Sequence, residues 1–183
     1  MPGRAVAPDI AAILAKIEDA MSTVQTQSAY HLERIDGQEV QKPSPKKLHA
    51  LIERYLVIVL AHHLPKQYVA APELNVLCGE DRLVPDVTVT ERMARYDDGD
   101  LADSPLVAIE ILSPGRTVGQ LFDKADRLVR AGAPVCWVIW PERRQAWMYS
   151  SHLLIEAKEV LTAALSDGSR IEVSLPEMWA ELD

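Results

Sequence analysis

The sequence predicts a single α/β domain with a mixed central sheet flanked by helices. The stretch PLVAIEIL (105–112) is apolar on both faces apart from one glutamate, which is typical of a central strand covered on each side. PVCWVIWP (134–141) predicts another buried strand, and between the two, residues 117–131 have the pattern of a helix that ends at Gly132. This order of strand, helix and strand favours a sheet with helices packed against it.

The first half of the chain predicts two helices and a hairpin. Residues 8–25 carry apolar side chains at helical spacing, and we expect residues 1–27 to form an N-terminal helical extension. The Asp36-Gly37 pair predicts a turn between two short strands. Ser44 is suited to be an N-cap, with Pro45 at the first position of a mostly buried helix that runs to about Leu64.

Further strands are predicted on either side of the buried stretch. QYVAAPELNVL (67–77) and DRLVPDVTVT (81–90) have the character of two strands with an antiparallel connection between them. Residues 91–104 are polar and are predicted to form a loop, and QAWMYS (145–150) begins a strand after residues 134–141. No repeat or linker interrupts the sequence, so we expect residues 1–183 to form one domain with its N-terminal extension.

The composition limits the classes of protein to which the chain can belong. Hydrophobic residues make up 48% and charged residues 25% of the chain, as in ordinary globular proteins. No apolar run approaches the roughly 20 residues that span a bilayer, so we expect a cytoplasmic protein without membrane contact. The formal net charge of −8 works against strong binding to nucleic acid that is independent of sequence, and the two cysteines lack the spacing of a zinc site.

Two acidic residues are the first candidates for chemistry. Glu110 interrupts a buried strand, and a buried carboxylate without a partner costs several kcal/mol, so either a buried Lys or Arg or a metal ion must compensate it. Asp86 follows Pro85 on the preceding predicted strand. Carboxylates from neighbouring strands can hold Mg²⁺, which would activate water and neutralise phosphate charge.

A lysine is the third candidate. A cation next to such a site can stabilise the transition state, but Leu112 occupies the position two residues after Glu110 on the same strand face. Lys124 lies on the same side of the predicted helix as Leu121 and Leu128, so it should face the sheet. The alternative is a lysine whose stem packs while its amine reaches water.

In combination, these residues resemble a known family. LVPDVTVT (83–90), PLVAIEILSP (105–114), Lys124, Ala131-Gly132-Ala133-Pro134 and VCWVIWPE (135–142) are similar to the Uma2 family of proposed restriction endonucleases, from about Glu33 to Tyr149. The resemblance implies the restriction-endonuclease-like fold of the PD-(D/E)XK nuclease superfamily. It also implies Asp86 and Glu110 as ligands of Mg²⁺ or Mn²⁺ and Lys124 as a catalytic lysine displaced from the strand to the helix.

The resemblance also indicates supporting residues and departures. Asp36-Gly37-Gln38 resembles the Asp-Gly-Glu of the family, and His49 resembles its helix histidine, although a lone histidine on an apolar helix is more often a hydrogen-bonded core residue. Gln38 stands where an acid is usual, Gln120 where Asp is usual and Leu128 where Tyr is common. We take Glu39, His49 and Gln120 as candidate supporting residues around the metal ligands.

Two functions follow from these patterns. The first is a divalent-metal-dependent endonuclease that hydrolyses phosphodiesters of nucleic acid, with DNA as the expected substrate and Asp86, Glu110 and Lys124 as catalytic residues. The second is a degenerate nuclease fold that serves as a binding or assembly module, which the acidic net charge favours. Tryptophans in the apolar strands could belong to the core or to a subunit interface, and we expect a homodimer.

Overall fold

The computed structural model describes residues 32–42, 44–151 and 153–183. The chain divides into two units, residues 1–30 and 31–183. The described helices and strands belong to the second unit. The predicted N-terminal helix over residues 8–25 lies outside the described residues. None of the described helices is both long and apolar enough to cross a membrane.

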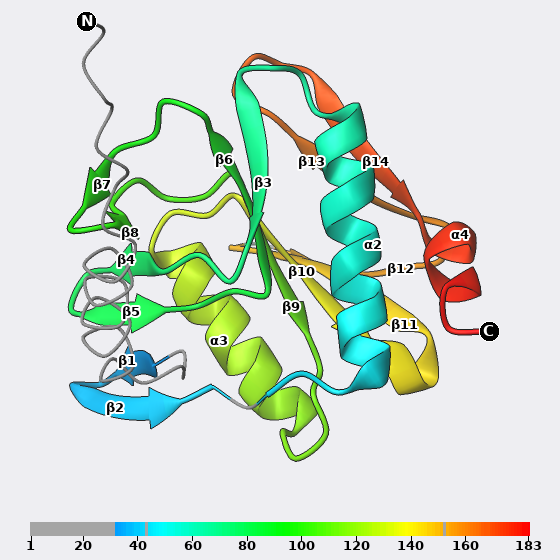
Figure 1. The fold of residues 1–183 in the computed structure, drawn as a ribbon, viewed down its shortest axis with the longest axis horizontal. Coiled ribbons are helices and arrows are strands. Elements are labelled where there is room, and N and C mark those ends of the chain that lie inside the picture. Colours follow the sequence, from blue (N-terminus) through cyan, green and yellow to red (C-terminus); the bar gives the residue numbers. More distant parts are fainter. Residues whose placement is uncertain (1–31, 43, 152) are drawn as a thin grey trace, which may run out of the picture. The chain divides into compact units, whose positions relative to one another are not determined.

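A mixed six-stranded sheet forms the centre of this unit, in the order β12-β11-β10-β9-β6-β3 (Figure 1). Strands β9 and β10 are parallel, and every other neighbouring pair is antiparallel. Helix α3 connects the two parallel strands, as predicted from the order of strand, helix and strand. The strands are β3 (Tyr68–Pro72), β6 (Val87–Glu91), β9 (Val107–Ile111), β10 (Val135–Trp140), β11 (Gln145–Ser150) and β12 (Leu153–Ala157).

Helices α2 (Lys47–His63) and α3 (Val118–Arg130) cover opposite faces of this sheet (Figure 1). Successive side chains of a strand point to opposite faces. Accordingly, Ile109 packs in the core that contains α2, whereas Ala108 packs in the core that contains α3. Both faces of β9 are buried, which explains its continuous apolar sequence and confirms the predicted fold class.

A second six-stranded sheet lies beside α3, in the order β2-β1-β5-β4-β8-β7 (Figure 1). Its residues Ile35, Cys78 and Leu83 belong to the same apolar cluster as the buried side of α3, so this helix is enclosed between the two sheets. The predicted hairpin at Asp36-Gly37 is present as β1 and β2. The strands are β1 (Leu32–Ile35), β2 (Gln38–Gln41), β4 (Val76–Cys78), β5 (Asp81–Leu83), β7 (Tyr96–Asp97) and β8 (Asp100–Leu101).

Each of the two strands predicted over residues 67–77 and 81–90 is in fact two strands. The first stretch forms β3 and then β4, and the second forms β5 and then β6. Strands β3 and β6 pair in the central sheet, whereas β4 and β5 pair in the second sheet. Glu73, with a φ of +52°, breaks the first stretch, and Pro85 lies at the break in the second. The break places Asp86 immediately before β6, where the chain passes from one sheet to the other.

The prediction of a loop over residues 91–104 was wrong, because this segment contains the hairpin of β7 and β8. Asp98 and Gly99 have φ values of +47° and +89°, as a tight hairpin turn requires. An Asp-Gly pair is a recognised signal for this turn, and the polar composition around it concealed the signal. Leu101 is buried and anchors the hairpin.

The helix ends agree only in part with the sequence prediction. Helix α3 begins after Thr117, which forms a capping box with Gln120, and Gly132 follows its end with a φ of +112°. A Cβ atom at Gly132 would lie 2.5 Å from Ser104 Oγ, so this position needs glycine for space as well. Helix α2 has Lys46 as its N-cap instead of Ser44, so it begins two residues later than predicted.

The C-terminal part of the chain closes the core on the α2 side (Figure 1). A short 3-10 helix, η1 (Pro141–Arg143), separates β10 from β11. Leu161, Val173 and Met178 are buried in the cluster that contains α2. They belong to the hairpin β13 (Val160–Ala164) and β14 (Arg170–Ser174) and to helix α4 (Leu175–Ala180).

Candidate functional site

Asp86 and Glu110 lie next to each other at the edge between the two sheets. Val87 of β6 is opposite Ile109 of β9, so the register, continued by one position, places Asp86 opposite Glu110 with both side chains on the same face. The Asp86 N–H donates to the carbonyl of Ile109 at 3.0 Å, which keeps the two segments together. Both residues are 2% exposed and line one cavity of about 20 Å³. The two candidate acids from neighbouring segments of the sheet thus border one cavity.

Lys124 of α3 reaches the same cavity. Its Nζ lies 3.0 Å from Glu110 Oε1 and donates to the carbonyl of Val84 at 2.7 Å. The residue is only 4% exposed, so its amine does not extend into water. The contact with Glu110 lacks the angles of a hydrogen bond, and Oε1 is a buried atom without a hydrogen-bond partner among the described residues.

Glu33 of β1 is a member of this cluster that the sequence prediction missed. It is fully buried, and its Oε1 lies 2.5 Å from Lys124 Nζ and accepts the Val84 N–H at 3.0 Å. Its Oε2 lies 3.4 Å from Nη2 of Arg116. Strand alternation places Glu33 on the same face as Ile35, and this buried face was the signal that could have identified it.

Lys42 is the second missed residue. Its Nζ lies 2.7 Å from Asp86 Oδ1 and 2.9 Å from Glu73 Oε1. Lys42 follows β2 in a segment without helix or strand periodicity, so no pattern in the sequence indicated that its side chain turns inward.

His49 of α2 supports Asp86 from the other side. Its Nε2 lies 3.1 Å from Asp86 Oδ2, and its Nδ1 lies 3.7 Å from Glu53 Oε2. The Ile111 N–H donates to the same Asp86 oxygen at 2.6 Å. His49 is thus both a buried core histidine and a residue in contact with the candidate site, as each of the two interpretations of the sequence proposed in part.

The other two candidate supporting residues lie elsewhere. Glu39 is exposed on β2, where it is opposite Arg34. Gln120 is exposed on the first turn of α3, and its side chain accepts the Thr117 N–H at 2.9 Å. Within the described residues, neither contacts Asp86 or Glu110, because Glu39 points away from the core and Gln120 is used for helix capping.

The surroundings of Glu110 and Asp86 shift the pKa values of their carboxyl groups in opposite directions. Burial raises the pKa of Glu110 to about 7, against the opposing effect of Lys124. Burial also acts to raise the pKa of Asp86, but the charge of Lys42 and the contact with His49 outweigh it and hold this pKa well below its usual range. Two neighbouring carboxyl groups with such different proton affinities are characteristic of sites that carry out acid–base or metal chemistry.

Asp86 and Glu110 could supply some of the oxygen ligands of a small divalent cation. Two carboxylates on one cavity, with Glu110 Oε1 free of hydrogen bonds, offer the oxygen ligands that Mg²⁺ prefers, and this ion keeps several waters. No group of three or more His, Cys, Asp or Glu side chains is arranged to hold a metal ion within the described residues. A divalent ion would therefore depend on Asp86 and Glu110 together with water.

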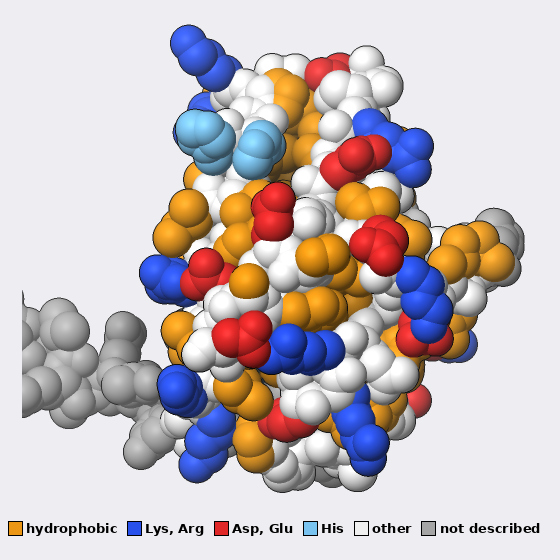
Figure 2. Space-filling model, turned by 90° about the vertical axis from the view of Figure 1, so that its right-hand side faces the viewer, with side chains coloured by type: hydrophobic (Ala, Val, Ile, Leu, Met, Phe, Trp, Pro, Cys, Tyr) orange, Lys and Arg blue, Asp and Glu red, His pale blue; other side chains and the backbone are white. Residues whose placement is uncertain are grey.

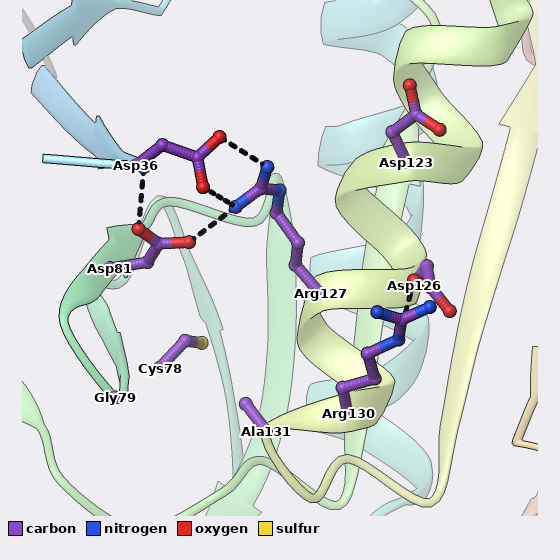
Figure 3. A pocket seen from close by; sticks show the side chains of 9 residues that line it. All are labelled: Asp36, Cys78, Gly79, Asp81, Asp123, Asp126, Arg127, Arg130 and Ala131. Atoms are coloured by element: carbon purple, nitrogen blue, oxygen red, sulfur yellow. Dashed lines mark hydrogen bonds and ion pairs between the residues drawn. The ribbon is translucent and has the colours of Figure 1, made fainter. Parts of the chain in front are cut away.

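Two pockets lie on either side of the outer surface of α3. One of about 420 Å³ shares Arg116 and Lys124 with the small cavity and is bordered by β2 and the first turn of α3. The other, of about 610 Å³, contains Arg127 between Asp36 and Asp81, and the Asp126–Arg130 pair lies nearby (Figure 3). Only the first of these pockets shares residues with the cavity of Asp86 and Glu110 among the described residues.

Comparison with known proteins agrees with the fold. A solved structure described as "a putative nuclease belonging to DUF820 from Anabaena variabilis" superimposes with a TM-score of 0.70 at 23% sequence identity, covering 83% of this chain and 91% of that chain. At this identity the likeness concerns the fold. No curated protein matches the chain. The family model Uma2, described as "Putative restriction endonuclease", matches residues 17–183, and the chain therefore belongs to the Uma2 family.

Proposed function

We propose that this protein is a divalent-metal-dependent endonuclease that hydrolyses phosphodiester bonds, with DNA as substrate and Mg²⁺ or Mn²⁺ as cofactor. One observation carries the proposal: Asp86, Glu110 and Lys124 line one buried cavity, in a chain whose family is described as "Putative restriction endonuclease". Buried ionisable groups with shifted pKa values cluster at functional sites, which supports this assignment.

Each residue of the cluster has a chemical role in this proposal. Asp86 and Glu110 would hold the ion, which, when bound, lowers the pKa of water and neutralises charge on the phosphate. Lys124 places its ammonium 3.0 Å from Glu110, where it can orient the attacking water and stabilise the negative charge of the transition state. Glu33 and the Val84 carbonyl fix Lys124 in that position.

The pocket of about 420 Å³ is the proposed entry for the substrate. Arg116 lies on the wall that this pocket shares with the small cavity, and its guanidinium can bind a phosphate oxygen on the way to the site. By contrast, the face in Figure 2 carries acidic and basic side chains interspersed, so phosphates gain little there. The expected homodimer stays a prediction.

One observation favours the alternative, a degenerate nuclease fold that acts as a binding module. Both oxygens of Asp86 already have partners: Oδ1 has Lys42, while Oδ2 has His49 and the Ile111 N–H. A site whose carboxylates are permanently neutralised by lysines would hold no metal and cleave nothing.

Cleavage assays with matched variants distinguish the two functions. Purified protein is incubated with linear DNA, circular DNA and RNA at low salt with Mg²⁺ or Mn²⁺, conditions under which weak phosphate contacts are strongest. We expect metal-dependent cleavage that Asp86→Asn and Glu110→Gln each abolish. Glu39→Gln makes the same chemical change at an exposed position and should retain full cleavage.

Metal binding provides the independent measurement. Titration calorimetry with Mn²⁺ should detect one site in the wild type and in Glu39→Gln, and much weaker binding in Asp86→Asn. Absence of both cleavage and Mn²⁺ binding in the folded wild type would reject the endonuclease in favour of the binding module. Unfolding of Glu110→Gln, judged by circular dichroism, would mean that this glutamate has a structural role.

A further inference from the structure

The ammonium of Lys42 occupies the side of Asp86 that faces the cavity. Lys42, Asp86 and Glu110 line the same cavity, and Lys42 Nζ lies 2.7 Å from Asp86 Oδ1. Asp86 Oδ2 is taken by the Ile111 N–H at 2.6 Å and by His49 Nε2 at 3.1 Å. The oxygen through which Asp86 would contact a metal ion is thus the one that already has a cation beside it.

The Lys42 ammonium and a divalent ion would compete for the same oxygen of Asp86. A divalent ion on Asp86 Oδ1 would lie within a few ångströms of the ammonium, in a buried environment where repulsion between like charges is strong. The size of the cavity also argues against binding of the ion beside Lys42, because about 20 Å³ has room for about one water molecule. Mg²⁺ keeps several waters when it is bound by one or two carboxylates, and it therefore needs more room than is present.

Of the two lysines on the cavity, Lys42 is the one that can leave. Lys124 projects from the middle of α3 and is held by Glu33, Glu110 and the Val84 carbonyl. Lys42 follows β2, an edge strand of the second sheet, and its ion-pair partners Asp86 and Glu73 contact only its terminal amine. The Lys42 side chain is 9% exposed against 4% for Lys124, and its flexible four-carbon stem can rotate the ammonium toward solvent.

We propose that Lys42 is a resident cation of the metal site, and that a divalent ion binds Asp86 and Glu110 only in exchange for the Lys42 ammonium. The exchange rests on the proposed function, since it concerns the same metal ligands. It makes Lys42 a residue that weakens metal affinity and keeps the carboxylates neutralised when no ion is bound. Metal occupancy and the position of the Lys42 side chain are thereby coupled.

Mn²⁺ titration of three proteins tests the exchange. Lys42→Met keeps the aliphatic stem and removes the ammonium, and Lys46→Met removes an exposed lysine from the same segment as a matched control. We expect the Kd for Mn²⁺ to fall about tenfold or more in Lys42→Met, because the ion no longer displaces a competing charge, and to stay unchanged in Lys46→Met. Without metal, Lys42→Met should have a lower Tm than the wild type, because Asp86 loses the ammonium beside it. Mn²⁺ should then raise the Tm of Lys42→Met by more than it raises the Tm of the wild type.

Chemical labelling observes the displacement in the wild type itself. Brief acetylation followed by mass spectrometry should modify Lys42 severalfold more in the presence of Mn²⁺ than in its absence, whereas Lys46 reacts equally in both and Lys124 remains protected in both. This experiment also decides the matter if Lys42→Met does not fold, and Lys42→Gln provides a second neutral variant for the titration.

The outcomes separate this inference from the proposed function. If the wild type binds Mn²⁺ and the neutral variants bind it equally or more weakly, Lys42 is a supporting residue and the exchange is wrong while the metal site stands. The same holds if Mn²⁺ leaves the labelling of Lys42 unchanged. If neither the wild type nor the neutral variants bind Mn²⁺, both the exchange and the metal-dependent endonuclease are rejected.

Discussion

Lys124 and Arg127 lie three residues apart on α3, and each connects this helix to the second sheet. Lys124 is buried and contacts Glu33 of β1 together with Glu110 of the central sheet. Arg127 has a side chain that is 33% exposed, and it contacts Asp36 and Asp81 at the rim of the pocket in Figure 3. Asp36 is 74% exposed.

Lys124 and Arg127 differ in their exposure to solvent. Arg127 binds Asp36 through two parallel hydrogen bonds and also contacts Asp81. Water screens these partly exposed charges, so we expect their ion pairs to add less to stability than the buried contacts of Lys124. Lys124 and its partners have lost their hydration, and each depends on the others to remain charged or hydrogen-bonded in the core. The ion pairs of Arg127 thus hold α3 to the second sheet at the surface, whereas those of Lys124 belong to the candidate site.

Removing Lys124 should have the largest effect. Lys124→Met leaves Glu33 and Glu110 buried without their shared cation, and we expect the free energy of unfolding to fall by about 3–5 kcal/mol. Urea denaturation measures this change, with the exposed Lys47→Met as control. Addition of Glu33→Gln should recover part of the loss, and a loss no larger than that of Lys47→Met would contradict the role of burial.

The raised pKa of Glu110 predicts the next largest effect, a dependence of stability on pH. The group binds its proton with a pKa of about 7 in the folded protein and 4.5 as the reference value, so the folded state holds more protons between these values. Stability should therefore fall as pH rises from about 4.5 to 7, by on the order of 3 kcal/mol from this group, since one pKa unit corresponds to about 1.4 kcal/mol.

The control for this dependence is Glu110→Gln, which removes the titrating group and keeps its shape. Unfolding by urea at a series of pH values should show a flatter profile for the variant than for the wild type. The remaining slope is expected from Glu53, whose pKa burial raises, and from His49. Burial acts to lower the pKa of His49, but the contact with Asp86 outweighs it and raises this pKa. Parallel profiles would mean that Glu110 does not titrate in this range.

Removing Arg127 should have the smallest effect and should respond most to salt. We expect Arg127→Gln to lower the free energy of unfolding by less than Lys124→Met does, because the exposed Asp36 returns to water and only Asp81 is left partly buried without this partner. The difference from wild type should shrink further at about 1 M NaCl, where exposed charges are screened within a few ångströms. An effect as large as that of Lys124→Met would remove the distinction between the two clusters.

The sequence determined the elements whose own patterns are strong. The continuous apolar run of β9 and the periodic face of α3, with a glycine at its end, were sufficient for the order of strand, helix and strand. The same patterns singled out Glu110, because a charge inside a buried strand requires a partner, and Lys124, because it lies on the sheet-facing side of α3.

Tertiary structure alone decided which residues complete the cluster and how the strands divide. Glu33 and Lys42 form ion pairs with residues far away in the sequence. Strand alternation indicates only the buried face on which Glu33 lies, and no local pattern indicates that the Lys42 side chain turns inward. Likewise, the stretches 67–77 and 81–90 read as single strands because each part has strand character, while their division between two sheets depends on pairing with distant partners. Local sequence sets the propensity and the face of a segment, but burial of a charge next to its partner is a property of the assembled core.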